Sequence, residues 1–149
     1  MKKTLVTTAM LLACGTAAAG DYEVNFGGVT HHFRNDQEHQ DLNYGLGFGY
    51  NIDKAVGFDV GFYQNSNYTT TKYALVRYQP FEVKGVRLGF LAGVADGYKP
   101  FRNGGWFPAA LPAASKSFGP VNVTLVGFPS IGKTADGMVS LQLGYTFGK

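Results

Sequence analysis

The sequence predicts an all-β chain that forms an eight-stranded antiparallel up-and-down transmembrane β-barrel. Segments of about ten residues alternate apolar side chains with small or polar ones, as the strands of a membrane barrel do. Turn-forming residues separate these segments, and the high content of Gly (21), Phe (12) and Tyr (9) suits strands and tight turns better than helices. A length of 149 residues corresponds to one domain.

The start of the chain has the pattern of an export signal, so residues 1–20 are expected to be a signal peptide and residues 21–149 an outer-membrane β-barrel domain. Its positive start, apolar centre and small-residue cleavage site are Lys2-Lys3, Leu5–Ala13 and Ala17–Ala19. The segment ending at Cys14 also resembles a lipobox, in which this cysteine would be lipidated and retained, and both alternatives stay open. Since Cys14 is the only cysteine, no disulfide is expected.

Four strands are expected in the first half of the chain. The alternation is clearest after residue 41, where large apolar residues at even positions alternate with asparagine and glycines at odd ones. An apolar face next to a small or polar face fits a wall between hydrocarbon and a crowded interior, which we expect to be lined by glycine. The expected strands are Tyr22–Phe33, Leu42–Tyr50, Ala55–Gln64 and Tyr68–Gln79.

Four further strands complete the expected barrel: Val86–Asp96, Trp106–Ser117, Val121–Gly127 and Met138–Phe147. The sixth is unusual because it contains Pro108 and Pro112, which cannot donate a backbone hydrogen bond to a neighbouring strand. Either this strand begins after Pro112, or the wall is meant to part here and admit lipid, since unpaired backbone is costly in hydrocarbon.

The connections between the expected strands alternate in length. Long ones at 34–41, 97–105 and 128–137 alternate with short ones at 51–54, 80–85 and 118–120. Bacterial barrels have short turns in the periplasm and long loops outside, so both termini are expected to be periplasmic. His32 and Ser66 then follow outward-running strands and reach the same external rim.

Aromatic residues stand where the strands would cross the membrane interfaces. Tyrosine and tryptophan prefer that depth, which predicts an aromatic girdle, although strand propensity alone also enriches these residues. The candidates are Tyr22, Tyr44, Tyr50, Tyr63, Tyr68, Tyr73, Tyr78, Trp106 and Tyr145.

Ser66 is the candidate nucleophile, in the polar cluster that follows the third expected strand. A serine hydroxyl needs a base to take its proton, and chain topology brings His32 to the same rim. The alternative is that His32 is only a rim histidine, hydrogen-bonded to a loop.

No cofactor, metal or nucleic acid is expected. Gly127–Thr134 matches the phosphate-loop pattern, but that motif needs a following helix, whereas a strand is expected next. His31 and His32 are neighbours on a strand and point to opposite faces, so they cannot easily share one ion. The net charge of +3 comes from singly spread Lys and Arg without a basic cluster.

Several segments resemble the lipid A palmitoyltransferase (PagP) family of outer-membrane barrels: Gly89–Val94, Pro108–Ser115, Phe118–Val121 and Phe128-Pro129. The resemblance covers most of the chain after the expected signal peptide. It implies a monomeric barrel without a cofactor that moves a palmitoyl chain from a phospholipid to lipid A or lipopolysaccharide in the outer membrane. It also implies an acyl pocket inside the barrel and lipid access through gaps in the wall flanked by Pro108, Pro112, Pro120 and Pro129.

The resemblance also assigns site residues. Val29–His32 is similar to the family segment with the catalytic histidine, which falls on His32, and Gln64–Asn67 to the segment with an aspartate and a serine. Ser66 keeps the serine, whereas Asn65 replaces the aspartate. Arg77 falls on the family's glycine at the pocket floor, and the family's N-terminal amphipathic helix is missing.

Two other functions remain possible on sequence grounds. A small non-catalytic outer-membrane barrel could present the loops Arg34–Asp41 and Gly97–Gly105, and the Asn65 and Arg77 departures favour it. A soluble lipocalin-like barrel in the periplasm would need an apolar interior, which the glycine-rich faces argue against.

Overall fold

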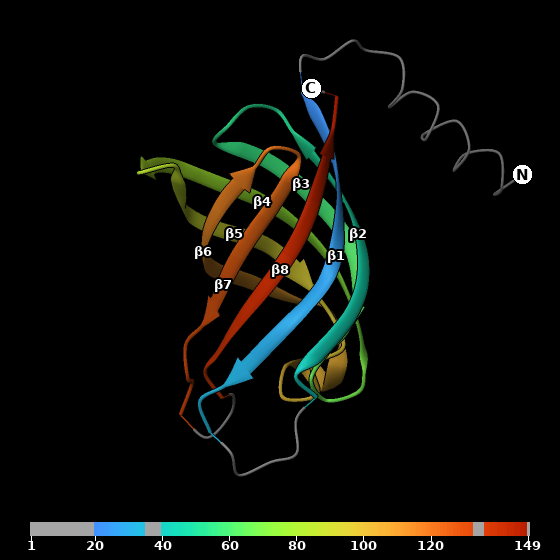
Figure 1. The fold of residues 1–149 in the computed structure, drawn as a ribbon. Coiled ribbons are helices and arrows are strands. Elements are labelled where there is room, and N and C mark those ends of the chain that lie inside the picture. The colour runs from blue at the N-terminus through green and yellow to red at the C-terminus, as the bar shows by residue number, and fades with distance from the viewer. Residues whose placement is uncertain (1–19, 35–39, 133–135, 149) are drawn as a thin grey trace, which may run out of the picture.

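The computed structural model describes residues 20–34, 40–132 and 136–148, which form a closed barrel of eight antiparallel strands (Figure 1). Each strand pairs with its neighbours in sequence, and the first closes on the last. The strands are β1 (Asp21–His32), β2 (Leu42–Asn51), β3 (Val56–Gln64), β4 (Thr70–Val83), β5 (Val86–Ala95), β6 (Phe107–Phe118), β7 (Val121–Phe128) and β8 (Met138–Phe147). The predicted fold class is confirmed. The signal-peptide prediction, Gly20 apart, lies outside the described residues.

Helix is almost absent from the described part of the chain, where one short 3-10 turn, η1 (Arg102–Gly104), interrupts the connection between β5 and β6. None of the helical structure in the described ranges is long and apolar enough to cross a membrane.

The expected strand boundaries agree with the structure except at β4, which is longer than predicted. It continues past Gln79 to Val83, and the turn to β5 is only Lys84 and Gly85, with positive φ of 51° and 77°. Two-residue turns of this handedness match the twist of a hairpin. Pro80 is tolerated because it lies where the pairing of β4 with β5 shifts, between Tyr78 and Phe81.

The barrel has two different ends. The terminal end carries Asp21 and Phe147 together with the short connections, and the loop end carries the long ones (Figure 1). β1 and β3 both finish at the loop end, at His32 and Gln64, as the strand order predicts.

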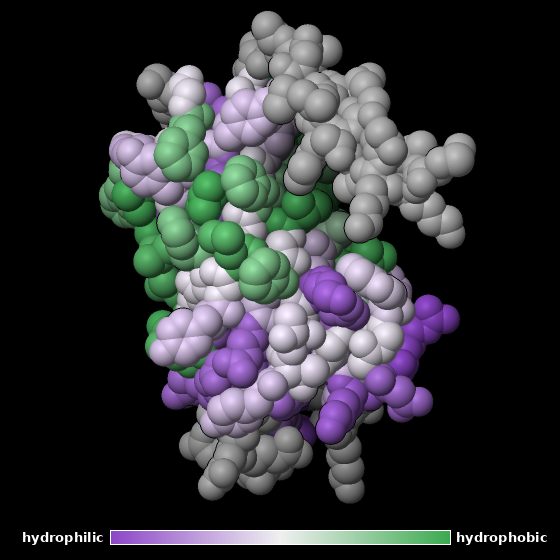
Figure 2. All heavy atoms as spheres, turned by 90° about the vertical axis from the view of Figure 1, so that its right-hand side faces the viewer, coloured by the Kyte–Doolittle hydropathy of each residue, from purple (hydrophilic) through white to green (hydrophobic). Residues whose placement is uncertain are grey.

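The outside of the barrel is apolar. Large hydrophobic side chains project from the strands into the surroundings, among them Phe26, Phe48, Phe58, Val60, Phe62, Phe90 and Leu143. On the face that Figure 2 shows, hydrophobic residues gather in the half nearer the terminal end, while hydrophilic residues dominate toward the loop end. An apolar belt between polar regions is what a strand wall presents to a bilayer.

The inside is mostly polar. Buried side chains include Glu23, Thr30, Asn43, Asp59, Thr71, Arg77, Gln79, Ser115 and Asn122. The one apolar core cluster among the described residues consists of Leu91, Ala113 and Val126, with Leu75 and Leu111 packed against it. This inside-out distribution is opposite to that of a soluble barrel with an apolar interior.

The inward glycines accommodate larger side chains from across the lumen. A Cβ on Gly47 would lie 2.2 Å from the Tyr73 hydroxyl, and one on Gly144 would lie 2.5 Å from a Glu23 carboxylate oxygen. Glycines therefore line a crowded lumen, as the sequence predicts, and side chains from across the barrel fill the space that they leave. Tyr63 and Tyr73 also face the lumen rather than the membrane interface.

Candidate functional site

A β-bulge in β1 decides which way the end of this strand faces. The pairing with both neighbours shifts between Phe26 and Gly28, where β1 has one residue more than β8 and one fewer than β2. Before the bulge the odd-numbered Glu23 is buried, and after it the even-numbered Thr30 is buried. By the same alternation His32 faces the lumen, whereas an unbroken strand would have turned it outward.

His32 stands next to a polar patch on three neighbouring strands. The Thr30 hydroxyl donates to the hydroxyl of Ser140 at 3.1 Å and accepts a hydrogen bond from the Asn43 side chain. Ser140 lies opposite Thr30 in the β1–β8 ladder, and Met138 lies opposite His32. The lumen at the loop end is thus lined with hydroxyl and amide groups.

Ser66 lies in the turn between β3 and β4, which Asn65 organises. Asn65 is fully buried, and its Oδ1 accepts hydrogen bonds from the backbone N–H groups of Asn67 at 3.0 Å and Thr69 at 3.1 Å. Local bonds of this kind fix a turn without strand or helix partners. Ser66 is held in this turn with only 5% of its surface exposed.

The two predicted catalytic residues lie at the same end of the barrel. His32 is the last residue of β1 and Ser66 follows the last residue of β3 by two positions. β2 lies between β1 and β3 in the sheet. Gln40, which precedes β2, contacts the Ser66 turn, since its backbone N–H donates to the Ser66 carbonyl at 3.0 Å. The catalytic roles of His32 and Ser66 stay a prediction.

The amide of Asn65 makes contacts that an aspartate could not make. Its Nδ2 donates to the Thr71 hydroxyl at 3.0 Å and to the Gly97 carbonyl at 3.1 Å, and a carboxylate has no such donor. Gly97 belongs to the β5–β6 connection, so this amide joins the Ser66 turn to that loop. With both donors and its oxygen used here, Asn65 acts as a link within the rim.

A layer of tyrosines lies in the lumen next to the rim. The hydroxyls of Tyr63 and Tyr98 are 2.8 Å apart, and the ring centroids of Tyr63 and Tyr73 are 6.0 Å apart. Burial raises the pKa of the Tyr98 hydroxyl above its ordinary value, so this group is protonated at neutral pH. Tyr98 can therefore donate a hydrogen bond inside the barrel.

The ladder of the wall is interrupted between β6 and β7. β6 pairs with β5 from Lys116 to Phe107, whereas its pairing with β7 ends at Ala113 and Val126. Within the described ranges, Phe107–Pro112 therefore pairs on one side only. We call the boundary between Phe107–Pro112 and the end of β7 the seam. It lies in the half of the wall nearer the loop end.

Two prolines explain where the seam begins. Phe118 and Val121 are partners on either side of a two-residue turn. Residues in that position form a hydrogen-bonded pair in such hairpins, so by alternation the even-numbered residues of β6 should direct their N–H groups toward β7. Pro108 and Pro112 are even-numbered and have no N–H. The ladder stops at Pro112, the first of them from the turn. β6 nevertheless begins at Phe107, so the alternative that it starts after Pro112 is wrong.

Space inside the barrel adjoins the seam. Leu111 of β6 and Val126 of β7 line two cavities in the lumen, one nearer the loop end and one that also reaches Arg77. Across the seam, the ring of Pro112 lies against Gly127, where an added Cβ would be 3.5 Å away. The seam therefore separates the outside from the lumen by side chains without a hydrogen-bonded ladder.

The other two predicted lipid-access prolines are Pro120, which lies away from the seam, and Pro129, which lies at its loop end. Pro120 is in the turn at the terminal end, where its carbonyl accepts the Thr146 N–H at 2.8 Å. Pro129 directly follows the last residue of β7 at the loop end. Only Pro108 and Pro112 of the four lie on β6 within the unpaired stretch.

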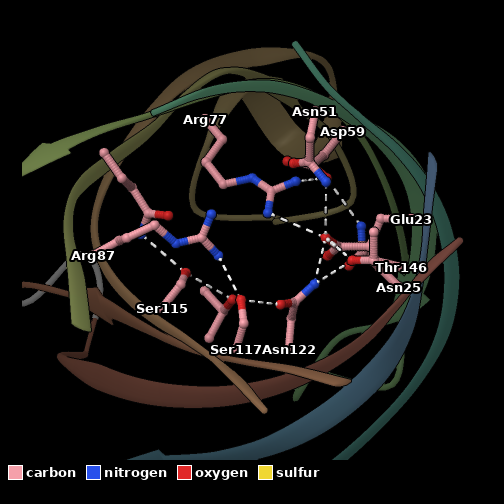
Figure 3. A network of polar contacts seen from close by, with 12 residues as sticks. Glu23, Asn25, Asn51, Asp59, Arg77, Arg87, Ser115, Ser117, Asn122 and Thr146 are labelled. Carbon is pink, nitrogen blue, oxygen red and sulfur yellow. Dashed lines mark hydrogen bonds and ion pairs between the residues drawn. The ribbon is translucent and has the colours of Figure 1, made fainter. Parts of the chain in front are cut away.

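A network of charged and polar side chains crosses the lumen toward the terminal end, and sequence reasoning did not predict it (Figure 3). Arg77 forms ion pairs with Glu23 at 3.5 Å and Asp59 at 3.1 Å. Asn122 donates to Glu23 at 2.8 Å, and Asn25 donates to Asp59 at 3.0 Å. The sequence signal that could have indicated this network was the presence of charged residues at inward positions of otherwise apolar strands.

This network limits the depth of the lumen. The second cavity has Leu75, Leu91 and Leu111 on its sides and reaches Arg77, Glu23 and Asp59. Arg77, which the sequence resemblance places at a pocket floor, therefore contributes a charged floor to this space. A chain entering from the loop end would meet hydroxyl and amide groups first, the leucines next and these charges last.

The closed topology and inside-out lining define an eight-stranded barrel of the outer-membrane type. Neither a family profile nor a curated protein sequence matches the chain. Among solved structures, it is similar to the de novo designed TMB2.3, with a TM-score of 0.60 and 12% identity over 90% of this chain and 100% of that one. It is also similar to the N-terminal β-barrel domain of Pseudomonas aeruginosa OprF, with a TM-score of 0.50 and 17% identity over 86% of this chain and 97% of that one. These likenesses support the fold.

Proposed function

We propose that this chain is an outer-membrane acyltransferase-like barrel that moves a palmitoyl or similar chain from a phospholipid to lipid A. The seam carries the proposal, because a wall without its ladder offers a membrane lipid a sideways route to the space lined by Leu111. The sequence resemblance to lipid A palmitoyltransferases supports the reaction, and the likeness to the OprF barrel domain supports the outer membrane as its location. We expect it to act as a monomer.

In this proposal His32 removes a proton from the Ser66 hydroxyl or directly from the acceptor hydroxyl. The resulting oxygen attacks the ester carbonyl of the phospholipid, and backbone N–H groups of the rim stabilise the oxyanion. The ester bond then breaks, and the lysophospholipid leaves as an alcohol with the proton from His32. If Ser66 is acylated first, a lipid A hydroxyl displaces the serine oxygen and returns its proton.

The test is to express the chain in cells that lack their own lipid A palmitoyltransferase and to weigh their lipid A. Addition of one acyl chain is expected for the natural sequence and its loss for Ser66→Ala, while the neighbouring Asn67→Ala serves as the matched control. Unchanged lipid A mass, with folded barrel recovered in the outer membrane, would reject the activity.

A non-catalytic barrel that acts through its external loops is the second candidate. The low exposure of Ser66 and the engagement of the Asn65 amide favour it, because neither group is arranged for an incoming substrate. A cell-surface phenotype that persists in Ser66→Ala and disappears when the Gly97–Gly105 loop is shortened would support this function instead.

A further inference from the structure

The β5–β6 connection covers the loop end of the seam with an aromatic ring. Phe101 of this connection stacks on Phe107, with ring centroids 4.8 Å apart and an angle of 22°. The same ring meets Phe128 edge-on at 6.2 Å and 72°. Phe107 is the first residue of β6 and Phe128 the last of β7, so Phe101 bridges the two strands where their ladder is missing.

The covering segment, Gly97–Gly104, is closed on itself. The Gly97 N–H donates to the Gly104 carbonyl at 2.9 Å and forms a neck, and the Phe101 N–H donates to the Tyr98 carbonyl at 2.9 Å. Because these bonds lie within the segment, it can move as a unit without breaking them. Its hold on the seam then depends mainly on ring contacts, with one hydrogen bond from Arg102 to the Trp106 carbonyl.

The backbone conformation of this segment is uncommon. Arg102 and Asn103 have φ of 48° and 55°, and Gly104 follows with φ of 85°. Two successive non-glycine residues in the left-handed region are unfavourable in an unrestrained chain. Contacts made by the folded segment, including the Phe101 stack, must compensate for this strain.

The β4 side of the segment is firmly attached. The Asp96 N–H donates to the Lys72 carbonyl at 3.0 Å, and the Gly97 carbonyl accepts the Asn65 amide. Gly97 itself has φ of 82°, and a Cβ there would lie 2.4 Å from the Thr70 carbonyl. One edge of the segment is thus fixed to the Ser66 turn, whereas the edge over the seam is held by ring contacts and by one hydrogen bond, from the Arg102 side chain to the Trp106 carbonyl at 3.3 Å.

We propose that Gly97–Gly104 is a hinged cover of the seam, with Phe101 as its latch and the attachment at Gly97 as its hinge. This regulation rests on the proposed sideways route for phospholipid. An acyl chain is apolar, so it can replace the Phe101 ring against Phe107 and Phe128 and open the cover as it passes. Displacement of the segment also pulls on Asn65, which couples lipid passage to the turn that carries Ser66.

The experiment locks the cover and measures lipid inside the barrel without relying on catalysis. Phe101→Cys and Phe128→Cys are joined by a short bis-methanethiosulfonate linker, which reductant removes, in barrels reconstituted into phospholipid vesicles. A photoreactive benzoylphenylalanine at Leu111, whose side chain faces the lumen, reports phospholipid there as a covalent adduct detected by mass spectrometry.

The matched control joins Ala92→Cys and Ala110→Cys. These residues are opposite each other on β5 and β6, at the edge of β6 that is fully paired, and both are exposed. This link engages β6 but leaves Gly97–Gly104 free, so it should not change the adduct yield.

The reduced double variant is expected to form phospholipid adduct. The linked form should lose most of this adduct, and reduction of the linker should restore it. Phe101→Ala should raise the initial rate of adduct formation about tenfold, the equilibrium effect of losing aromatic contacts of this size. Adduct formation that is equal in linked and reduced forms would overturn the cover while leaving the sideways route intact. Absence of adduct in every form, with folded barrel present, would reject the route itself and the cover with it.

Discussion

At the scale of single residues, Asn65 shows how an amide differs from the carboxylate it resembles in shape. Its Nδ2 is the donor in both hydrogen bonds that tie the Ser66 turn to Thr71 and Gly97. An aspartate would place a carboxylate oxygen against the Gly97 carbonyl and would leave both acceptors without their donor. Replacing Asn65 by aspartate, the residue of the family that this sequence resembles, should therefore disturb the rim.

We predict that Asn65→Asp lowers the free energy of unfolding by about 1–3 kcal/mol, the usual cost of leaving buried polar groups unpaired. Denaturant unfolding of the barrel in lipid vesicles measures this change. Asn67→Asp is the control, because Asn67 is exposed in the same turn and should change stability little. Equal stability of Asn65→Asp and the natural sequence would show that the amide donors are not needed.

At the scale of elements, β6 is a strand whose two edges behave differently. Its β5 edge is paired, whereas its β7 edge loses pairing at Pro112, where an N–H would be directed toward Gly127. One missing donor thus ends the ladder, although the strand continues for five more residues to Phe107.

Pro112→Val should extend the β6–β7 ladder, because valine supplies the missing N–H and suits a strand. We expect slower amide hydrogen exchange at Gly127 than in the natural protein and a protected amide at position 112, where the proline has none. NMR in micelles measures both, and any acyl transfer should decrease. Ala110→Val adds similar bulk to the same face without a new donor, so it should change neither. Exchange as fast as in the natural protein would show that the missing N–H does not cause the seam.

The sequence predicted the strands of this barrel because alternation repeats along each of them, and most boundaries agreed with the structure within two residues. It did not predict that His32 faces the lumen. The bulge near Gly28 shifts the alternation by one residue, and a shift of one residue leaves little trace in a pattern of period two. The Gly27-Gly28 pair was its only local sign.

The candidate site was harder to predict than the strands for a similar reason. Strand order brings His32 and Ser66 to one end, but the role of Asn65 depends on Gly97, which is 32 residues away in sequence. A parting of the wall was one of two alternatives that Pro108 and Pro112 suggested, whereas the Phe101 contacts depend on the path of a loop whose sequence has no periodicity.

At the scale of the whole molecule, one cation balances two carboxylates in the middle of the lumen. Arg77 is paired with Glu23 and Asp59, and each carboxylate receives at least one further hydrogen bond. Because these groups come from β1, β3 and β4, the network joins opposite parts of the wall and fills the lumen at that level.

Arg77→Gln should lower the free energy of unfolding by about 3–5 kcal/mol, since it leaves two buried carboxylates without their counter-charge. Adding Glu23→Gln and Asp59→Asn should recover much of that loss. Unfolding in vesicles compares the three forms, and Arg87→Gln, on a partly exposed arginine, is the control. A single variant as stable as the natural protein would mean that water already satisfies these carboxylates.

The pairing of β1 with β8 has a consequence for how the protein is made. Asp21 begins the first strand and Phe147 ends the last, and these strands are neighbours. The barrel can therefore close only after the ten residues of β8 have been synthesised. A nascent chain cut short before Met138 would expose two open sheet edges to the bilayer, which is a state with no satisfactory partner for its backbone. Premature termination late in this gene should therefore be as damaging as termination early in it.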